Sequence, residues 1–141
     1  MTRRVIQSFS IARAGSRIQN YMSGIYRSLD LNYTTNSDGV KFYWKASQNP
    51  DTYTDFRANS EGENKRDAKE IPVQEASNAV CRALEEQFSL PKDDLVRAAA
   101  NLMGINRIGS SVKTLFNRAI IWAENTKRIR KTDSGNWMLV E

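Results

Sequence analysis

The residue pattern that comes closest to an active site lies mid-chain, where Pro50-Asp51 is followed by Glu63-Asn64-Lys65. Two carboxylates and a lysine in this order are typical of metal-dependent nucleases, in which the acids bind Mg²⁺ and the lysine stabilises developing charge. That chemistry needs the second acid and the lysine on a buried strand, whereas residues 59–67 contain no apolar side chain to bury. We interpret the match as accidental and predict no metal site.

The composition removes most other catalytic chemistry. The 141 residues include no His and one Cys, so the usual zinc ligand sets, the Ser-His and Cys-His nucleophile pairs and the commonest general base are missing. The single cysteine, Cys81, lies in an apolar helical pattern and is interpreted as a small core residue. We therefore expect a chain that is not an enzyme and that uses no cofactor.

The charge balance favours a polyanionic partner. The chain has 21 Lys and Arg against 16 Asp and Glu, a net charge of +5. It has no apolar run near the roughly 20 residues of a membrane-spanning helix and no secretory signal, and a single cysteine cannot form an internal disulfide. These features predict a cytoplasmic protein without a membrane partner.

The chain resembles itself. Ile11-Ala12-Arg13-Ala14-Gly15-Ser16 returns 94 residues later as Ile105-Asn106-Arg107-Ile108-Gly109-Ser110. Apolar positions on the C-terminal side also match, for example Ile18 with Val112 and Met22 with Phe116. After a slip of two residues, Gly39 pairs with Gly135, and an aromatic or apolar run follows each glycine. The sequence therefore predicts two copies of one unit.

The second copy has the complete set of predicted elements. Apolar spacings of three and four residues predict helices over 72–88, 91–104 and 110–124, the last one capped by Ser110 or Ser111. Short strands over 128–131 and 137–140 flank a polar turn at 132–136. Three helices followed by a β-hairpin are typical of a winged helix.

The first copy has the same ending without the same beginning. Residues 3–9 match the tail of the second helix, Ser16 starts the third helix with a capping-box partner at Gln19, and residues 31–44 form the hairpin. The predicted fold class is mainly α with short β-hairpins (α+β), as tandem winged-helix-like units of which the first is truncated.

Three segments follow from this pattern: a C-terminal half-unit over 1–46, a polar linker over 47–69 with some order from Tyr53 and Phe56, and a complete unit over 70–141. A half-unit exposes the face that its missing helices should cover. We therefore expect either that the chain is the C-terminal piece of a longer protein or that a neighbouring chain supplies the cover, for example in a homodimer.

Two stretches carry a resemblance to a known family. The run from Phe9 to Ile18, closed by Gly39-Val40-Lys41-Phe42-Tyr43-Trp44, resembles the end of a small C-terminal domain of unknown function in large bacterial superfamily one DNA helicases. Residues 70–109 are similar to a segment that follows it. Those proteins combine helicase ATPase domains with a Vsr-like endonuclease-fold domain. The resemblance implies a noncatalytic tail, with DNA and the rest of a larger helicase polypeptide as partners, because this chain lacks the helicase and nuclease parts.

In a winged helix the third helix enters the major groove and the hairpin contacts the backbone or minor groove, so basic and amide side chains should gather there. Between residues 107 and 131 the only acid is Glu124. The alternative is a docking or scaffolding module whose charges are only solvated. The predicted DNA-binding residues are Arg107, Lys113, Thr114, Asn117, Arg118, Lys127, Arg128, Arg130 and Lys131, with Arg13, Arg17, Gln19, Asn20 and Arg27 in the first copy.

Some of these features have a structural interpretation as well. Arg13 and Arg107 precede the Gly-Ser of each copy and are either phosphate ligands or donors to the carbonyls of the turn. Gly15 and Gly109 are interpreted as turn residues, because no phosphate-loop pattern surrounds them. Trp44, Trp122 and Trp137 are interpreted as core or hairpin anchors rather than as platforms for single-stranded bases.

Overall fold

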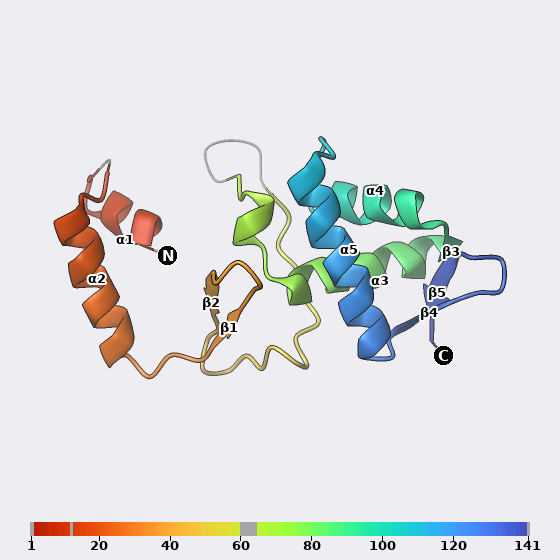
Figure 1. Cartoon of the computed structure of the whole chain (residues 1–141), viewed down its shortest axis with the longest axis horizontal. Helices are drawn as coiled ribbons and strands as arrows, with labels where there is room; N and C mark the ends of the chain where they lie inside the picture. Colours follow the sequence, from red (N-terminus) through yellow and green to blue (C-terminus); the bar gives the residue numbers. More distant parts are fainter. Residues whose placement is uncertain (1, 12, 60–64, 141) are drawn as a thin grey trace.

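The computed structural model describes residues 2–11, 13–59 and 65–140, and in them the chain has an α+β fold (Figure 1). The N-terminal elements lie at one end of the molecule and the elements from α3 onward at the other. The helices are α1 (Thr2–Ser8), α2 (Ser16–Ser28), the 3-10 helix η1 (Ala68–Glu70), α3 (Val73–Gln87), α4 (Lys92–Leu102) and α5 (Ser110–Asn125). The strands are β1 (Tyr33–Thr35), β2 (Lys41–Tyr43), β3 (Ser89–Leu90), β4 (Ile129–Lys131) and β5 (Trp137–Leu139).

The hydrophobic core lies between α3, α4 and α5, as the periodicity predicts. Phe116 and Ile120 from α5 are fully buried against Leu84 of α3 and Leu95 of α4. Each such side chain contributes roughly 1.5–3 kcal/mol by leaving water. Cys81 is buried in the same core, and burial raises the pKa of its thiol, which confirms the interpretation of this cysteine as a core residue.

The sheet of the C-terminal part contains one strand that the sequence does not predict. Ser89-Leu90 reads as an interruption between helices, but in the structure it is strand β3, which pairs antiparallel with β5 so that Leu90 lies opposite Trp137. The strand order is β3-β5-β4. A strand of two residues is too short to show an alternating pattern, so only its partner reveals it.

Helix α3 is buried around its whole circumference over its first two turns, because every residue from Gln74 to Cys81 is buried. Its apolar face packs on the core, whereas its polar face carries Glu75 and Asn78. The Glu75 side chain is only 2% exposed and accepts hydrogen bonds from Arg66 Nη1 (2.9 Å), Arg57 Nε (3.0 Å) and the Arg57 backbone N–H (3.2 Å). A second nitrogen of the Arg57 guanidinium, Nη2, also binds this carboxylate.

Asn78 fixes the same segment one turn further along α3. Its Nδ2 donates to the backbone carbonyls of Tyr53 and Asp55, both at 2.8 Å. Phe56 packs against the core between these contacts and the Arg57 pair. The segment predicted as a polar linker therefore covers α3, and its ordering extends beyond the predicted Tyr53 and Phe56 to both arginines.

Replacing Glu75 tests this arrangement. We expect Glu75→Gln to lower the free energy of unfolding by about 3 kcal/mol, because Arg66, 11% exposed, would keep a buried charge without its counter-ion. Glu85→Gln is the matched control, because the Glu85 pair with Arg82 is exposed on both sides and should cost about 0.5 kcal/mol or less. Urea titrations of both variants make the measurement. Equal losses would show that Glu75 is no more important than a surface acid.

The turns that follow α1 and α4 have the same backbone hydrogen bonds. Ile11 N–H donates to the Ile6 carbonyl (3.0 Å), and Ile105 N–H donates to the Ala100 carbonyl (2.9 Å), 94 residues later. Each turn contains a residue with positive φ at the same place, Ser10 at 59° and Gly104 at 68°. The backbone of the first turn thus has the same conformation as that of the second.

The two hairpins also share their register, with an offset of 96 residues. Tyr33 pairs with Tyr43 as Ile129 pairs with Leu139, and the other two pairs of each ladder correspond in the same way. Trp44 N–H donates to the Asn32 carbonyl as Val140 N–H donates to that of Arg128. Gly39 and Gly135 take positive φ at equivalent turn positions, which glycine adopts without strain.

The predicted helix caps are wrong. The N-cap residues of α2 and α5 are Gly15 and Gly109, both in extended conformation and without a side chain. Ser16 and Ser110 are already the first helical residues, from which a hydroxyl is badly placed to cap the next backbone N–H groups. Gln19 donates instead to the Ala14 carbonyl (3.1 Å), so no capping box forms with Ser16.

Gly104 is required by a close approach of the chain as well as by its backbone angle. Asn59 N–H donates to the Met103 carbonyl (2.8 Å), and a Cβ added at Gly104 would lie 2.6 Å from the Asn59 carbonyl oxygen. Gly135 has a positive φ too, with nothing within 4 Å of an added Cβ. A side chain at Gly135 would therefore meet backbone strain alone, whereas one at Gly104 would meet both backbone strain and steric overlap.

We expect Gly135→Ala to cost about 1–2 kcal/mol of folding free energy, because alanine is strained at positive φ. Gly104→Ala should cost about 1–3 kcal/mol more, because its Cβ would also displace the backbone at Asn59. Thermal or urea unfolding of both variants measures the difference. Equal costs would contradict the close packing of Asn59 on this turn.

Candidate nucleic-acid interface

The outward face of α5 is set by the stripe that it buries. Val112, Leu115, Phe116 and Ala119 are buried, and this leaves the intervening positions on the other side of the helix. Lys113, Thr114 and Arg118 are exposed there, and Asn117 is half-buried. The predicted α5 residues therefore share one accessible face. The Thr114 hydroxyl donates to the Ser110 carbonyl (3.0 Å), which leaves its oxygen free to accept.

The β4–β5 hairpin carries the second group of basic side chains. Arg130 and Lys131 are exposed on β4, while Ile129 beside them is buried in the core. Lys127 is exposed in the turn between α5 and β4 and has a positive φ of 58°. Because α5 and β4 both pack on the same core, these charges are held on rigid elements.

Arg128 does not belong to this surface. Its Nη1 donates to Asn78 Oδ1 at 2.6 Å and lies 3.5 Å from Ser77 Oγ, so the guanidinium completes the buried polar groups of α3. Arg128 thus has a structural role that the prediction of a DNA ligand does not include, because the buried amide oxygen of Asn78 needs a donor and the sequence gives no sign that this donor comes from 50 residues away.

Arg118 connects the two halves of the chain. Its Nη1 lies 3.5 Å from Asp38 Oδ2, and Asp38 belongs to the β1–β2 turn. The first hairpin thus contacts the outward face of α5. Both side chains are about half exposed, so this ion pair is worth at most about 1 kcal/mol.

The predicted residues of the first copy lie on α2 and the turn before it. Arg13, Arg17, Gln19, Asn20 and Arg27 are all exposed. At 100° per residue, Asn20 and Arg27 lie on the side of α2 opposite Met22 and Ile25, and Arg17 lies at the edge of that side. The first copy thus presents basic and amide groups on one side of its helix, as α5 does.

Arg13 and Arg107 are exposed beside equivalent turns. Among residues 2–11, 13–59 and 65–140, neither guanidinium hydrogen-bonds a carbonyl of its turn. Their position leaves them accessible to an anion in solution.

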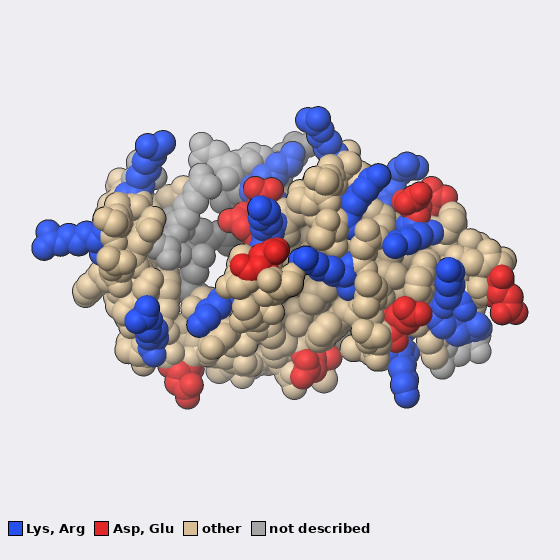
Figure 2. Space-filling model, in the orientation of Figure 1, with Lys and Arg blue, Asp and Glu red and all other residues tan. Residues whose placement is uncertain are grey.

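The face that carries α5 has a mixed distribution of charge (Figure 2). Lys and Arg side chains extend over α5 and the hairpin, with Asp and Glu side chains between them. Exposed pairs on α3 and α4, namely Arg82 with Glu85 and Arg97 with Asp94, neutralise part of the charge there. The hairpin turn carries Asp133, but none of the ion pairs among the described residues involves Arg130 or Lys131.

The three tryptophans are buried or half-buried. Trp137 is buried at the centre of the sheet, and Trp122 is half-buried on α5. Trp44 is buried, donates from Nε1 to Thr34 Oγ1 (3.0 Å) and packs edge-on against Tyr53 with ring centroids 5.1 Å apart. Trp44 and Trp137 are thus the hairpin anchors that the sequence predicts, and Trp44 also ties the first hairpin to the segment on α3.

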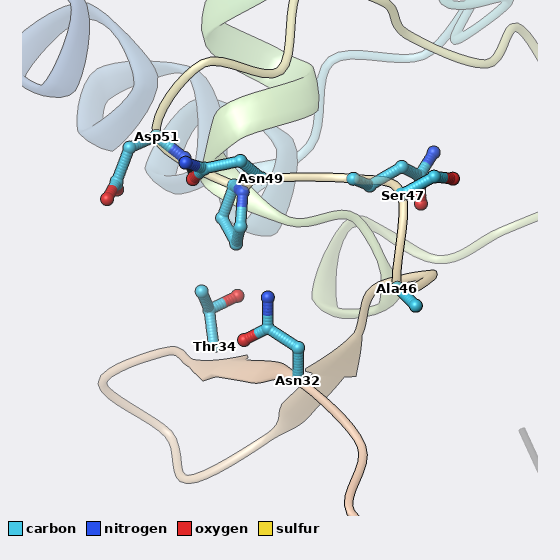
Figure 3. A pocket seen from close by; sticks show the side chains of 8 residues that line it. Asn32, Thr34, Ala46, Ser47, Asn49 and Asp51 are labelled. Carbon is cyan, nitrogen blue, oxygen red and sulfur yellow. Dashed lines mark hydrogen bonds between the residues drawn. The ribbon is translucent and has the colours of Figure 1, made fainter.

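A polar hollow of about 500 Å³ lies beside the first hairpin, lined by Asn32, Thr34 and residues 46–51. Figure 3 shows Asn32 and Thr34 pointing from the hairpin toward the loop that carries Asn49. Asn49 Oδ1 already accepts from Asp51 N–H (3.0 Å), and Gln48 Oε1 accepts from Lys45 N–H (3.1 Å). These amides hold the loop itself, and the lining of the hollow includes Asp51 and no Lys or Arg, so the hollow does not extend the basic surface.

In the described part of the chain, no group of three or more His, Cys, Asp or Glu side chains is placed to hold a metal ion. Glu63 and Asn64 of the nuclease-like pattern lie outside the described residues. None of the helices in residues 2–11, 13–59 and 65–140 has the length and apolarity needed to cross a bilayer.

Comparison of the chain with family models, with curated proteins and with solved structures found no match.

Substitutions of Arg128 and Arg130 distinguish an arginine that hydrogen-bonds a buried group from one that is exposed to solvent. We expect Arg128→Met to lower the free energy of unfolding by about 1–3 kcal/mol, because Asn78 Oδ1 loses its donor inside the protein. Arg130→Met, the matched control, should change it by about 0.5 kcal/mol or less, because Arg130 is exposed. Chemical unfolding makes the comparison, and a stable Arg128→Met protein would contradict the buried role.

Proposed function

We propose that the chain is a noncatalytic DNA-binding module built from two winged-helix-like units, of which the first is truncated. The observation that carries the proposal is the common orientation of Lys113, Thr114 and Arg118 on the outward face of α5, beside a hairpin with Arg130 and Lys131 exposed. These side chains are suited to phosphate oxygens and base edges.

The arrangement of elements supports the winged-helix-like interpretation. Helices α3, α4 and α5 share one core, the hairpin follows the third helix directly, and β3 closes the sheet beside β5. In this arrangement the third helix would enter the major groove while the hairpin contacts the phosphate backbone. The shared turns and hairpin register support a first unit of the same type that begins within its second helix.

DNA would compete with the contact between the two halves. Arg118 already pairs with Asp38, but an exposed pair of this kind is weak enough for a phosphate to replace it. Binding through α5 would then require the first hairpin to release Arg118.

The resemblance to the tail of bacterial helicases supports a place for this module in a larger DNA-processing polypeptide. The module would hold or position DNA for catalytic domains elsewhere in that polypeptide. Duplex and forked DNA are the substrates of such machinery, so both belong in the test.

Salt-dependent binding to fluorescent duplex, forked and single-stranded DNA tests the proposal by anisotropy. Each phosphate contact should contribute about 0.9 to the slope of log affinity against log salt. We expect Arg130→Ala with Lys131→Ala to weaken binding and to lower that slope by about 2. No binding of any of the three DNAs at about 50 mM salt would overturn the proposal.

The matched control removes the same number of charges elsewhere. Arg82→Ala with Arg97→Ala takes two exposed cations from α3 and α4, where each already has an acidic partner. Its slope should equal that of the unmodified chain. An equal loss in both double variants would show that only net charge matters and that the hairpin is not the contact.

A further inference from the structure

Helix α2 carries an apolar surface for which the described part of the chain provides no complete cover. We define the α2 surface as Ile18, Tyr21, Met22, Ile25 and Leu29, which share one side of the helix at spacings of three and four. Tyr21 is 72% exposed and Leu29 48% exposed, and no described residue of α2 is buried. Phe9, in the turn before α2, is 73% exposed. Exposed apolar groups clustered in this way mark an interaction site.

The second unit shows what covers the equivalent positions. Counted from the shared Gly-Ser, the α2 surface corresponds to Val112, Leu115, Phe116, Ala119 and Ala123 of α5, all of which are buried. Their cover comes mainly from α3, whose Ala76, Ala79, Val80 and Ala83 pack in the same core. The cover of this face is thus a helix with small apolar residues along one side.

The geometry needed to receive such a helix is already present in the first unit. The turns after α1 and α4 share the backbone hydrogen bonds that end the two helices, and both α2 and α5 begin at an N-cap glycine in extended conformation. Helix α1 thus takes the place of the end of α4. Among the described residues, α3 and the short strand β3 have no counterpart in the first unit, and the apolar side of α3 is already used in its own core.

The net charge of residues 2–28 indicates the sign of the charge that a partner should carry. Residues 2–28 contain five Arg and no Asp or Glu. A second copy docked through its own α2 would bring two such segments together, which is unfavourable for like charges. An acidic helix would be attracted instead, as α3 carries Glu85 and Glu86 at its C-terminal end.

We propose that the α2 surface docks an amphipathic helix of another polypeptide, one with small apolar residues along one side and acidic residues beside them. This site is separate from most of the predicted DNA-binding residues of α2, because Asn20 and Arg27 lie on the opposite side of the helix and Arg17 lies at the edge between the two sides. The partner helix would complete the first unit as α3 completes the second.

The test uses the full chain labelled with ¹⁵N and a synthetic peptide of residues 72–88 as the α3-type probe. We expect saturable chemical-shift changes confined to residues 9–29. Met22→Asp should weaken binding by at least about tenfold, equivalent to about 1.4 kcal/mol. Tyr21→Glu serves as a second variant at a more exposed position, in case Met22→Asp disturbs α2 itself. A peptide with Glu85→Lys and Glu86→Lys should bind more weakly.

Ile121→Asp is the matched control, because Ile121 is 55% exposed on α5 and lies outside the α2 surface. It should leave peptide binding unchanged. Three results would each overturn the proposal: shift changes only in α3, α4 and α5, a Met22-dependent dimer of the chain in ultracentrifugation, or Met22-dependent binding to vesicles of phosphatidylcholine and phosphatidylserine without peptide binding. Loss of DNA binding with intact peptide binding would affect only the proposed function.

Discussion

The carboxylate of Glu75, held inside the protein by two guanidiniums, determines how the chain before α3 must run. A buried carboxylate is costly unless it is paired and hydrogen-bonded, and both cations come from the segment between the first hairpin and η1. That segment therefore has to pass along α3. Where it does, Asn59 bonds to the Met103 carbonyl and Phe56 packs against the core, so the ion cluster is accompanied by contacts to the end of α4 and to the helix core.

The elements that sequence reasoning predicts are those whose signal repeats within a few residues. The buried stripe of α5 shows at every third or fourth position, and Gly39 and Gly135 mark their turns because a positive φ favours glycine. The outward residues Lys113 and Arg118 follow from the same stripe, since the inward face defines the outward one. This part of the candidate interface needs no information beyond local pattern.

The features that sequence reasoning misses depend on partners far away in the chain. Arg128 and Arg130 are equivalent in a charge count, yet one meets Asn78, 50 residues earlier, and the other faces solvent. In the sequence Arg57 and Arg66 have the composition of a polar linker around them, and only the fold shows that both pair with the buried Glu75. Strand β3 is too short to show without β5 beside it. The role of an arginine or lysine in a basic chain is ambiguous from sequence alone, because the same side chain can donate to an interior acceptor or to an external anion.

Helices α3 and α5 differ in how much of their circumference the protein uses. From Gln74 to Cys81, α3 has apolar neighbours on one side and hydrogen-bonded polar neighbours on the other, while Lys113, Thr114 and Arg118 leave the outward side of α5 largely exposed. Substitutions are therefore expected to be costly at every position from Gln74 to Cys81 and to cost little on the outer side of α5. The outer side of α5 can therefore differ between related chains without disturbing the core, whereas the first two turns of α3 tolerate little change.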